Sequence, residues 1–235
     1  KYKNGLKIFK KFLEDNNPNH EQLINSIKII YASIKENMGK NKNALIYDMD
    51  TINIQDKIEQ YLPVRKIEKD LYGEVFTPQS LIEEMLGKLP KSVWSNPDLK
   101  WLDPANGIGN FPMIAFKMLD KGLSKVSGYE NKTKRHNHII KNMLYMVELN
   151  EKNVAVSRKI FGESANIFCG SFLNKSNDDV NQDFIEKFGV EKFDIIMGNP
   201  PFNMEKRDNN KTAPSLWDKF LLTSLDILKK NKYLT

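Results

Sequence analysis

Two short segments carry side chains whose types and spacing could do chemistry at the edge of a parallel sheet. In the first, Asp103-Pro104-Ala105-Asn106-Gly107-Ile108-Gly109, an apolar run ends in a glycine-rich turn and a helical pattern follows. Glycines in such a turn let a ligand approach the backbone closely. A pyrophosphate would be repelled by the charge of Asp103, and a dinucleotide site would hold a third small residue where this chain has Pro112. The turn therefore favours a cationic ligand, such as the methionine ammonium group of S-adenosylmethionine.

The second segment, Asn199-Pro200-Pro201-Phe202, follows a buried-type apolar run. Its prolines lock φ and carry no amide hydrogen, so it rigidly displays two acceptors, the Asn199 side-chain oxygen and the Pro200 carbonyl. An exocyclic amine on an aromatic ring is a poor nucleophile because its lone pair is delocalised. Two acceptors on its hydrogens would favour a tetrahedral nitrogen and expose that lone pair to an activated methyl group. Phe202 offers a flat face to an extruded base, a contact worth about 1–3 kcal/mol.

The region from Tyr72 onward must position both segments, and it alternates short apolar runs with helical patterns. That alternation is typical of βαβ units around a parallel sheet, so we predict an α/β, Rossmann-like fold. A helix should begin at Pro78, capped by Thr77, and run to Gly87. Other helices are predicted at 111–121, 133–142, 151–161, 180–188 and 215–230. Strands are predicted at 100–102, 144–149, 166–169, 193–197 and from Tyr233 onward.

The first seventy residues have helical spacing and no alternation of the kind that marks strands. One apolar helix face is formed by Leu23, Ile24, Ile27, Ile30, Tyr31 and Ile34. We therefore predict a helical amino-terminal segment at residues 1–70 and a catalytic α/β domain at residues 71–235. Because the chain ends as the strand from Tyr233 begins, we expect the sheet of this domain to be incomplete at its carboxyl-terminal side.

The composition narrows the function without fixing it. A net charge of +6 and a pI of about 9.1 suit an anionic partner such as nucleic acid, and equally a lysine-rich solvated surface. The single cysteine, Cys169, fits a reducing cytosol, and we expect it in the core. No apolar run is long enough to span a bilayer, so we expect a cytoplasmic protein. Since His136 and His138 lie in a predicted helix and the chain has three histidines, we predict no metal site.

Taken together, Asp103-Pro104-Ala105-Asn106-Gly107-Ile108-Gly109 and Asn199-Pro200-Pro201-Phe202 resemble the N6-adenine DNA methyltransferases of restriction-modification systems. Gly73-Glu74-Val75-Phe76-Thr77-Pro78 resembles the amino-terminal cofactor motif of that family. This motif order is that of the gamma group and of the large fused restriction enzymes, and the resemblance covers about residues 72–235. It implies direct transfer of a methyl group from S-adenosylmethionine to a flipped-out adenine of double-stranded DNA.

The resemblance also implies roles for residues of the first two strands. Thr77 would help to hold the methionine carboxylate of the cofactor, and Asp103 and Ala105 would line its methionine part, at the turn formed with Gly107 and Gly109. Tyr145-Met146-Val147-Glu148-Leu149-Asn150 resembles the second-strand motif, in which the acidic residue, here Glu148, takes both ribose hydroxyls. Glu130 is a rival because it is nearer the usual spacing of about twenty residues. We prefer Glu148 because its strand precedes a helix that ends in Arg158-Lys159-Ile160-Phe161, as in the family.

The remaining implied roles fall at the third and fourth strands. Cys169-Gly170-Ser171-Phe172-Leu173 resembles the third-strand motif, where Phe172 would pack on the cofactor adenine. Ser171 stands where the family usually has an aspartate, and its hydroxyl can accept a hydrogen bond without the charge. Asn199, Pro200, Pro201 and Phe202 would form the catalytic motif.

Other functions share part of this pattern. Guanine-N2 methyltransferases of ribosomal RNA and glutamine methyltransferases of release factors also use Asn-Pro-Pro-aromatic, but Phe76-Thr77-Pro78 favours DNA adenine. A methyltransferase-fold subunit that binds DNA or a partner without catalysis is the other alternative, given Ser171. Intact Asp103, Glu148 and Asn199 argue against it. No segment resembles a module that reads base edges, so we expect a further chain or subunit to carry target recognition.

Overall fold

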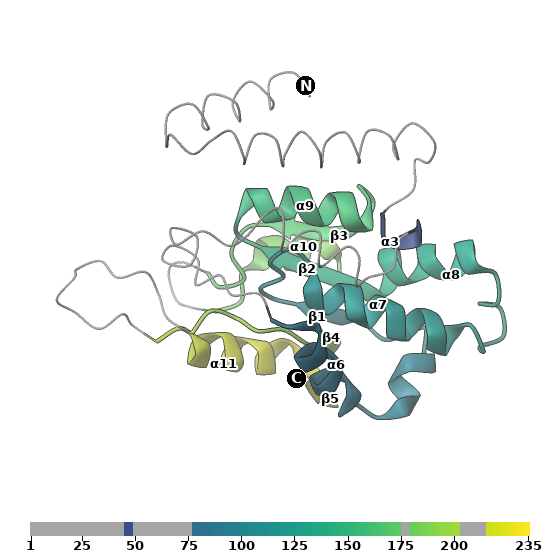
Figure 1. The fold of residues 1–235 in the computed structure, drawn as a ribbon. Helices are drawn as coiled ribbons and strands as arrows, with labels where there is room; N and C mark the ends of the chain where they lie inside the picture. Colours follow the sequence, from purple (N-terminus) through teal and green to yellow (C-terminus); the bar gives the residue numbers. More distant parts are fainter. Residues whose placement is uncertain (1–44, 49–76, 175–178, 203–214) are drawn as a thin grey trace, which may run out of the picture. The chain divides into compact units, whose positions relative to one another are not determined.

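The structure is a computed structural model that describes residues 45–48, 77–174, 179–202 and 215–235 (Figure 1). The chain divides into two compact units, one made of Lys1–Lys42 and Asp56–Pro63 and the other of Asn43–Gln55 and Val64–Thr235. All described residues belong to the second unit, which contains both motif segments. The predicted apolar helix face at residues 23–34 lies outside the described residues.

One sheet of five parallel strands forms the centre of this unit, in the order β3-β2-β1-β4-β5. A parallel sheet with helices on both faces buries its strands, and every residue of β1, β2 and β4 is buried accordingly. The predicted α/β fold class is confirmed. The strands are β1 (Trp101–Asp103), β2 (Leu144–Glu148), β3 (Asn166–Cys169), β4 (Phe193–Ile196) and β5 (Leu228–Leu234).

The strand order reverses next to β1, which pairs with β2 on one side and with β4 on the other. The chain moves outward from β1 to β3 and then returns to place β4 and β5 on the opposite side. In sheets of this kind, ligands bind beyond the carboxyl ends of the strands at such a reversal. Asp103 ends β1, and Asn199 follows β4 by three residues, so both motif segments meet at this point.

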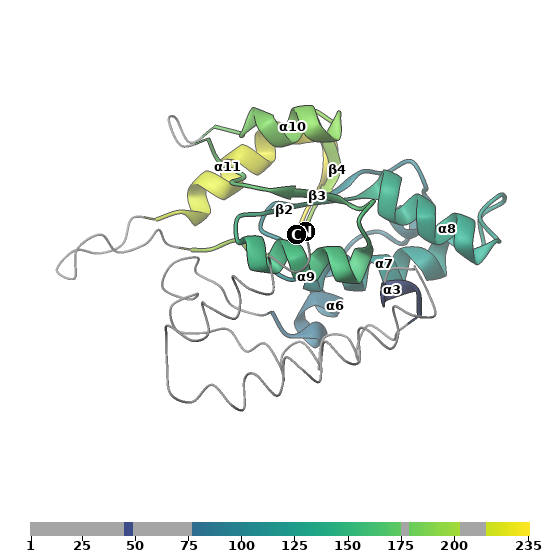
Figure 2. The same cartoon turned by 90° about the horizontal axis from the view of Figure 1, so that it is seen from above.

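Helices cover both faces of the sheet. Figure 2 shows α10 and α11 on one face and α7 and α9 on the other. Three of the helices begin with an asparagine whose side chain accepts a backbone amide hydrogen, at Asn131, Asn150 and Asn181. The helices are α3 (Leu45–Asp48), α6 (Gln79–Gly87), α7 (Asn110–Leu123), α8 (Lys132–His138), α9 (Glu151–Phe161), α10 (Gln182–Phe188) and α11 (Trp217–Ile227), with a 3-10 turn, η1 (Lys91–Ser95), before β1 and a π-helix, η2 (Ile139–Met143), before β2.

Apolar side chains fill the space between the sheet and the helices on either side. The cluster on the α10 and α11 side contains buried residues of four strands or strand ends and of both helices: Leu102, Tyr145, Val147, Phe172, Leu173, Phe184, Ile185, Phe193, Ile196, Phe220 and Ile227. On the other side α7 is the central helix, and nine of its fourteen residues are buried. The short α3 packs there too, because the Tyr47 ring lies 6.2 Å from that of Phe116 and 5.1 Å from that of His136.

The predicted bounds of the last helix and the last strand are wrong. β5 begins at Leu228 rather than Tyr233, and the helix predicted to reach Lys230 ends at Ile227. Lys229 and Lys230, which the predicted helix included, belong to an irregular strand, whose register against β4 shifts and in which Asn231 has a φ of 58°. Lys229 and Lys232 place their ammonium groups 2.8 and 3.4 Å from the carboxylate of Asp194, which is buried at the start of β4.

Two smaller predictions are also wrong. Cys169 is exposed rather than buried, because it is the last residue of β3 and β3 is an edge strand. The helix predicted at residues 133–142 is not one regular α-helix, since its second half is the π-helix η2. Among the described residues, no helix is both long enough and apolar enough to cross a membrane.

Candidate active site

The carboxyl group of Asp103 is the most deeply buried acid at the strand reversal. Asp103 is 1% exposed, and its Oδ1 accepts a hydrogen bond from the Ala105 amide at 3.1 Å. Burial raises its pKa to about 8; the Ala105 hydrogen bond opposes this rise, and the negative charge of Glu148 adds to it. A carboxyl group in this state ionises readily when a cation comes close, so the site is suited to a positively charged ligand.

Glu148 ends β2 and reaches across to the glycine turn that follows β1. Its Oε2 accepts from the Gly107 amide at 2.6 Å, and its Oε1 accepts from the Asn150 amide at 2.7 Å. Among the described residues, and apart from Gly107 and its two chain neighbours, no heavy atom lies within 4 Å of the position that a Cβ on Gly107 would take. The turn therefore presents a carboxylate beside open space. Leu149, the next residue, is exposed at the same edge.

The second glycine of the turn serves packing. Gly109 has a φ of 99°, and a Cβ there would lie 2.5 Å from the Phe161 ring of α9. A hydrogen bond also holds α9 against the glycine turn, since the Asn106 side-chain nitrogen donates to the Ser157 hydroxyl at 2.9 Å. Sequence reasoning missed Asn106 and Ser157 as positioning residues. The sequence held a signal, because Asn153 and Ser157 share the helical spacing of the apolar Ile160 and Phe161 in α9, and the structure buries all four residues.

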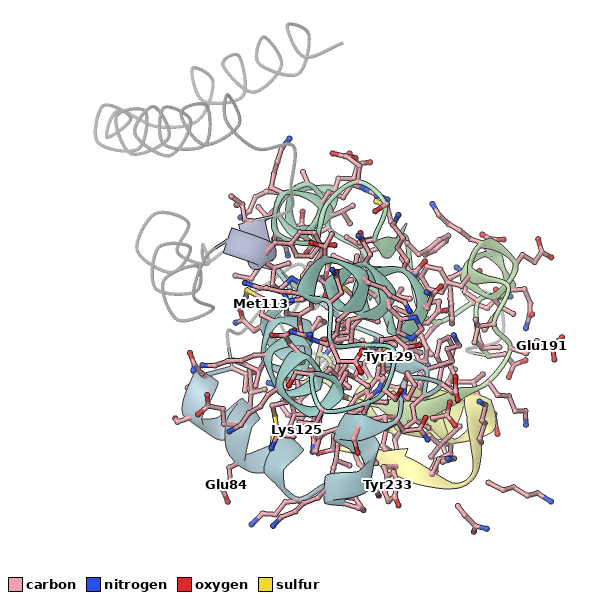
Figure 3. All side chains as sticks on the ribbon, turned by 90° about the vertical axis from the view of Figure 1, so that its right-hand side faces the viewer. Glu84, Met113, Lys125, Tyr129, Glu191 and Tyr233 are labelled. Atoms are coloured by element: carbon pink, nitrogen blue, oxygen red, sulfur yellow. The ribbon has the colours of Figure 1, made fainter. Side chains whose placement is uncertain are left out.

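The rival acid, Glu130, lies at the other end of α7. Its carbonyl accepts from Arg135, whose Nε is bonded to Asp120 near the end of that helix. The fourteen residues of α7 separate this loop from the glycine turn by about 21 Å. Figure 3 looks onto this loop, which contains the labelled Lys125 and Tyr129. The structure thus brings Glu148, and not Glu130, to the glycine turn.

Asn199 is joined to a residue far away in the sequence. Its Nδ2 donates to the Thr77 hydroxyl oxygen at 3.2 Å, and Thr77 is buried at 6% exposure. The predicted cap is wrong, because Pro78 occupies the cap position of α6 and no side chain caps the helix. Gly198 packs on Asp103 so closely that a Cβ there would lie 2.8 Å from Oδ1. The segments before α6, after β1 and after β4 therefore meet at one place.

Two aromatic side chains are exposed next to this motif. Phe202 is 63% exposed, and its carbonyl accepts from the Leu216 amide at 2.9 Å and from the Trp217 amide at 3.4 Å. Trp217 is 50% exposed, whereas Phe220, three residues later in α11, is buried. Pro200 and Pro201, which separate Asn199 from Phe202 in the chain, are partly buried.

The third-strand residues lie at the other side of the reversal. Ser171 donates its hydroxyl hydrogen to the Leu173 carbonyl at 2.7 Å, which leaves its oxygen able to accept. Phe172 is 2% exposed and packs in a stacked arrangement against Phe184 and Phe220, with ring centroids 5.6 and 5.3 Å apart. Its contact with a cofactor adenine stays a prediction.

Comparison with known proteins identifies the family. The model of the N-6 DNA Methylase family matches residues 54–224, which is most of the chain. The chain is 27% identical over 225 residues to an uncharacterized adenine-specific methylase of Mycoplasma pneumoniae, covering 67% of this chain and 53% of that protein. It therefore spans about half the length of that curated relative.

Two solved structures resemble the fold at low identity. The M protein of the type I restriction enzyme EcoKI is 14% identical with a TM-score of 0.44, over 78% of this chain and 40% of that one. The DrdV–DNA complex is 17% identical with a TM-score of 0.47, over 77% of this chain and 21% of that one. The family match, which takes in the glycine turn and the Asn-Pro-Pro-Phe segment, assigns this chain to the N-6 DNA methylases.

Proposed function

We propose that this chain transfers a methyl group from S-adenosylmethionine to the N6 amino group of an adenine flipped out of double-stranded DNA. The place of Asn199 supports this most strongly. It follows β4 beside the buried Asp103 and precedes the exposed Phe202 by three residues, at the point where the strand order reverses. Membership of the N-6 DNA methylase family supports adenine as the target.

The residues at the glycine turn fit S-adenosylmethionine. Asp103 gives its cationic part a carboxylate, and Glu148, already directed at the Gly107 amide, has oxygens for two ribose hydroxyls. Among the described residues, the space beside the Gly107 Cα is unoccupied, so part of the ligand could approach the backbone there. When bound, this cofactor supplies a methyl group that its positively charged sulfur makes electrophilic. Residues that would also line it are Thr77, Ala105, Gly109, Leu149, Ser171 and Phe172.

The protein would bind the target amino group only through hydrogen-bond acceptors. Asn199 Oδ1 and the Pro200 carbonyl accept its two hydrogens and turn its lone pair toward the methyl group. The bond from nitrogen to the methyl group would form as the sulfur–methyl bond breaks, its electron pair staying on sulfur as a neutral thioether. The methylated nitrogen then carries a positive charge, and it loses one hydrogen as a proton to solvent while these oxygens accept hydrogen bonds from it. Phe202 follows Asn199 by three residues, and the Trp217 amide donates to the Phe202 carbonyl. Both aromatic side chains are exposed and would offer faces for stacking with the extruded base.

We further propose that residues 71–235 carry catalysis within a restriction-modification system, and that a further chain or subunit reads the DNA sequence. The M protein that resembles this chain belongs to a type I restriction enzyme. Residues 1–70 would form a separate helical segment.

The test is tritium transfer from labelled S-adenosylmethionine by the full-length protein. Unmethylated genomic DNA, ribosomal RNA and a release factor are offered in parallel, and digested DNA is examined for N6-methyladenine. We expect label in DNA adenine only, and none with Asn199→Ala. Label in RNA or in the release factor alone would move the activity to those substrates. Cofactor binding without any transfer would indicate a subunit that binds without catalysis.

A further inference from the structure

The hydrogen bond between Thr77 and Asn199 joins a residue expected to touch the cofactor to the residue expected to touch the base. The two lie 122 positions apart in the chain, and their atoms are 3.2 Å apart. Asn199 donates through Nδ2, so its Oδ1 is left for another partner. Thr77 is 6% exposed, and water therefore competes little for its hydroxyl.

This pair alone does not decide which way the amide points. A carboxamide keeps its shape when its oxygen and nitrogen exchange places. A hydroxyl can donate one hydrogen and can also accept, so Thr77 is compatible with either orientation. Only one orientation of Asn199 is useful for the proposed chemistry. If its NH2 group faced the target amine, two hydrogen-bond donors would face each other and no hydrogen bond would form. The group that accepts a hydrogen bond from the Thr77 hydroxyl therefore decides the orientation of the Asn199 side-chain amide.

We propose that the carboxylate of the bound methyl donor accepts a hydrogen bond from the Thr77 hydroxyl and thereby fixes the orientation of the Asn199 side-chain amide. A carboxylate only accepts, so Thr77 must donate to it and must accept from Asn199 Nδ2. Asn199 Oδ1 then faces the base. Thr77 is in this sense a positioning residue as well as a cofactor contact, and the inference rests on the proposed function.

The start of α6 suits an anion at this place. The helix begins two residues after Thr77, has no acidic residue in its first turn and has no side-chain cap. The amino end of a helix carries partial positive charge, which favours a carboxylate near it. The cationic part of the same ligand would lie toward Asp103, which packs against Gly198 on the other side of Asn199.

The test compares Thr77→Val, which keeps the shape and removes the hydroxyl, with Thr77→Ser, which keeps the hydroxyl. Thr133→Val is the matched control, because Thr133 is exposed on α8. At saturating cofactor we expect Thr77→Val to lower kcat roughly tenfold or more, the worth of one hydrogen bond in a buried site. Thr77→Ser should recover most of that loss, and Thr133→Val should match the unaltered protein.

A second readout does not need turnover. In protein labelled with 15N-asparagine, the Asn199 side-chain NH2 signal is the one that disappears in Asn199→Asp. We expect S-adenosylmethionine to shift this signal in the unaltered protein and in Thr77→Ser, and not in Thr77→Val. Decarboxylated S-adenosylmethionine, at concentrations where calorimetry shows binding, should leave it unshifted.

The outcomes separate the inference from the proposed function. If Thr77→Val weakens cofactor binding but keeps kcat at saturation, Thr77 only binds the cofactor and the inference is wrong. The same holds if the decarboxylated cofactor shifts the Asn199 signal as the complete one does. If the unaltered protein methylates no DNA while the signal responds as expected, the proposed function fails and the positioning of Asn199 stands.

Discussion

Glu148 Oε2 accepts a hydrogen bond from the Gly107 amide at 2.6 Å and so ties the end of β2 to the turn after β1. Two neighbouring strand ends are thereby joined at one edge of the sheet. If ribose hydroxyls bind there, Glu148→Ala should weaken S-adenosylmethionine binding strongly, because hydrogen bonds to a charged group are each worth about 1.5–3 kcal/mol. Calorimetry on the purified protein measures this loss.

Glu130→Gln is the matched control for that measurement. Glu130 is exposed in the loop after α7, and hydrogen bonds from the amides of Glu130 and Gly128 lower its pKa. We expect its replacement to leave cofactor affinity unchanged. Loss of binding in Glu130→Gln, with retention in Glu148→Ala, would assign the ribose to Glu130 and overturn the proposed site.

Asp103 makes cofactor binding depend on pH. Its pKa in the folded protein is about 8, so near neutral pH it is largely protonated before binding. A bound cation favours the ionised form, and binding should therefore release up to one proton at pH 7 and tighten as the pH rises toward 8. Calorimetry in buffers of different ionisation enthalpy counts this proton. Asp103→Asn should bind more weakly and release none, and equal proton release in both proteins would contradict the assignment.

The same group should affect stability in the absence of cofactor. Because the pKa of Asp103 is raised on folding, its contribution to stability is present at pH below about 4 and is lost as the pH rises toward 8. Asp103→Asn removes the cost of keeping that group neutral. We expect this variant to be more stable than the unaltered protein at pH 8, by on the order of a few kcal/mol, and equally stable near pH 4. Urea unfolding at both values measures the difference.

The exposed side chains of Phe202 and Trp217 should be needed for DNA and not for the fold. Phe202→Ala and Trp217→Ala should each lower kcat/KM for DNA by an amount equivalent to about 1–3 kcal/mol, the worth of one stacked base. Both side chains are at least half exposed, so cofactor affinity should change little. Leu222→Ala is the control, because Leu222 is an apolar residue of α11 with the same exposed fraction as Phe202, 63%. A loss in Leu222→Ala equal to that in Phe202→Ala would argue against stacking.

Much of the fold and part of the site could be predicted because the signals are local. Apolar runs bounded by turns located the strands, and β3 and α9 have the predicted bounds. The meeting of Asp103 and the Asn199 segment also followed from a general rule, since carboxyl ends of parallel strands share one edge. No local pattern separated Glu148 from Glu130. The structure places Glu148 in contact with the glycine turn, and its role toward the ribose stays a prediction.

What could not be predicted depends on distant residues. The hydrogen bond of Thr77 to Asn199 spans 122 positions, and spacing suggested instead that Thr77 caps the next helix. The lysines after Ile227 have the pattern of an exposed helix face. Two of them, Lys229 and Lys232, pair with Asp194, more than thirty residues earlier, and these ion pairs stabilise the strand. In both places a tertiary contact overrides the local preference.

Asp194 provides the last prediction, which concerns stability at low pH. Burial by itself would raise the pKa of Asp194, but hydrogen bonds from Lys229 and from the Lys100 amide, with the charge of Lys229, hold it below its ordinary value. For an acid whose pKa is lowered on folding, the stabilisation is present above the unfolded value and is lost as the pH falls through the folded value. Asp194→Asn should therefore be less stable at pH 7, by about 1–3 kcal/mol, with a difference that shrinks below about pH 4. Thermal unfolding from pH 7 to pH 3 tests this, with Asp98→Asn, an exposed acid before β1, as the control. A difference that stays constant down to pH 3 would show that shape or packing, and not the charge of Asp194, holds β5 in place.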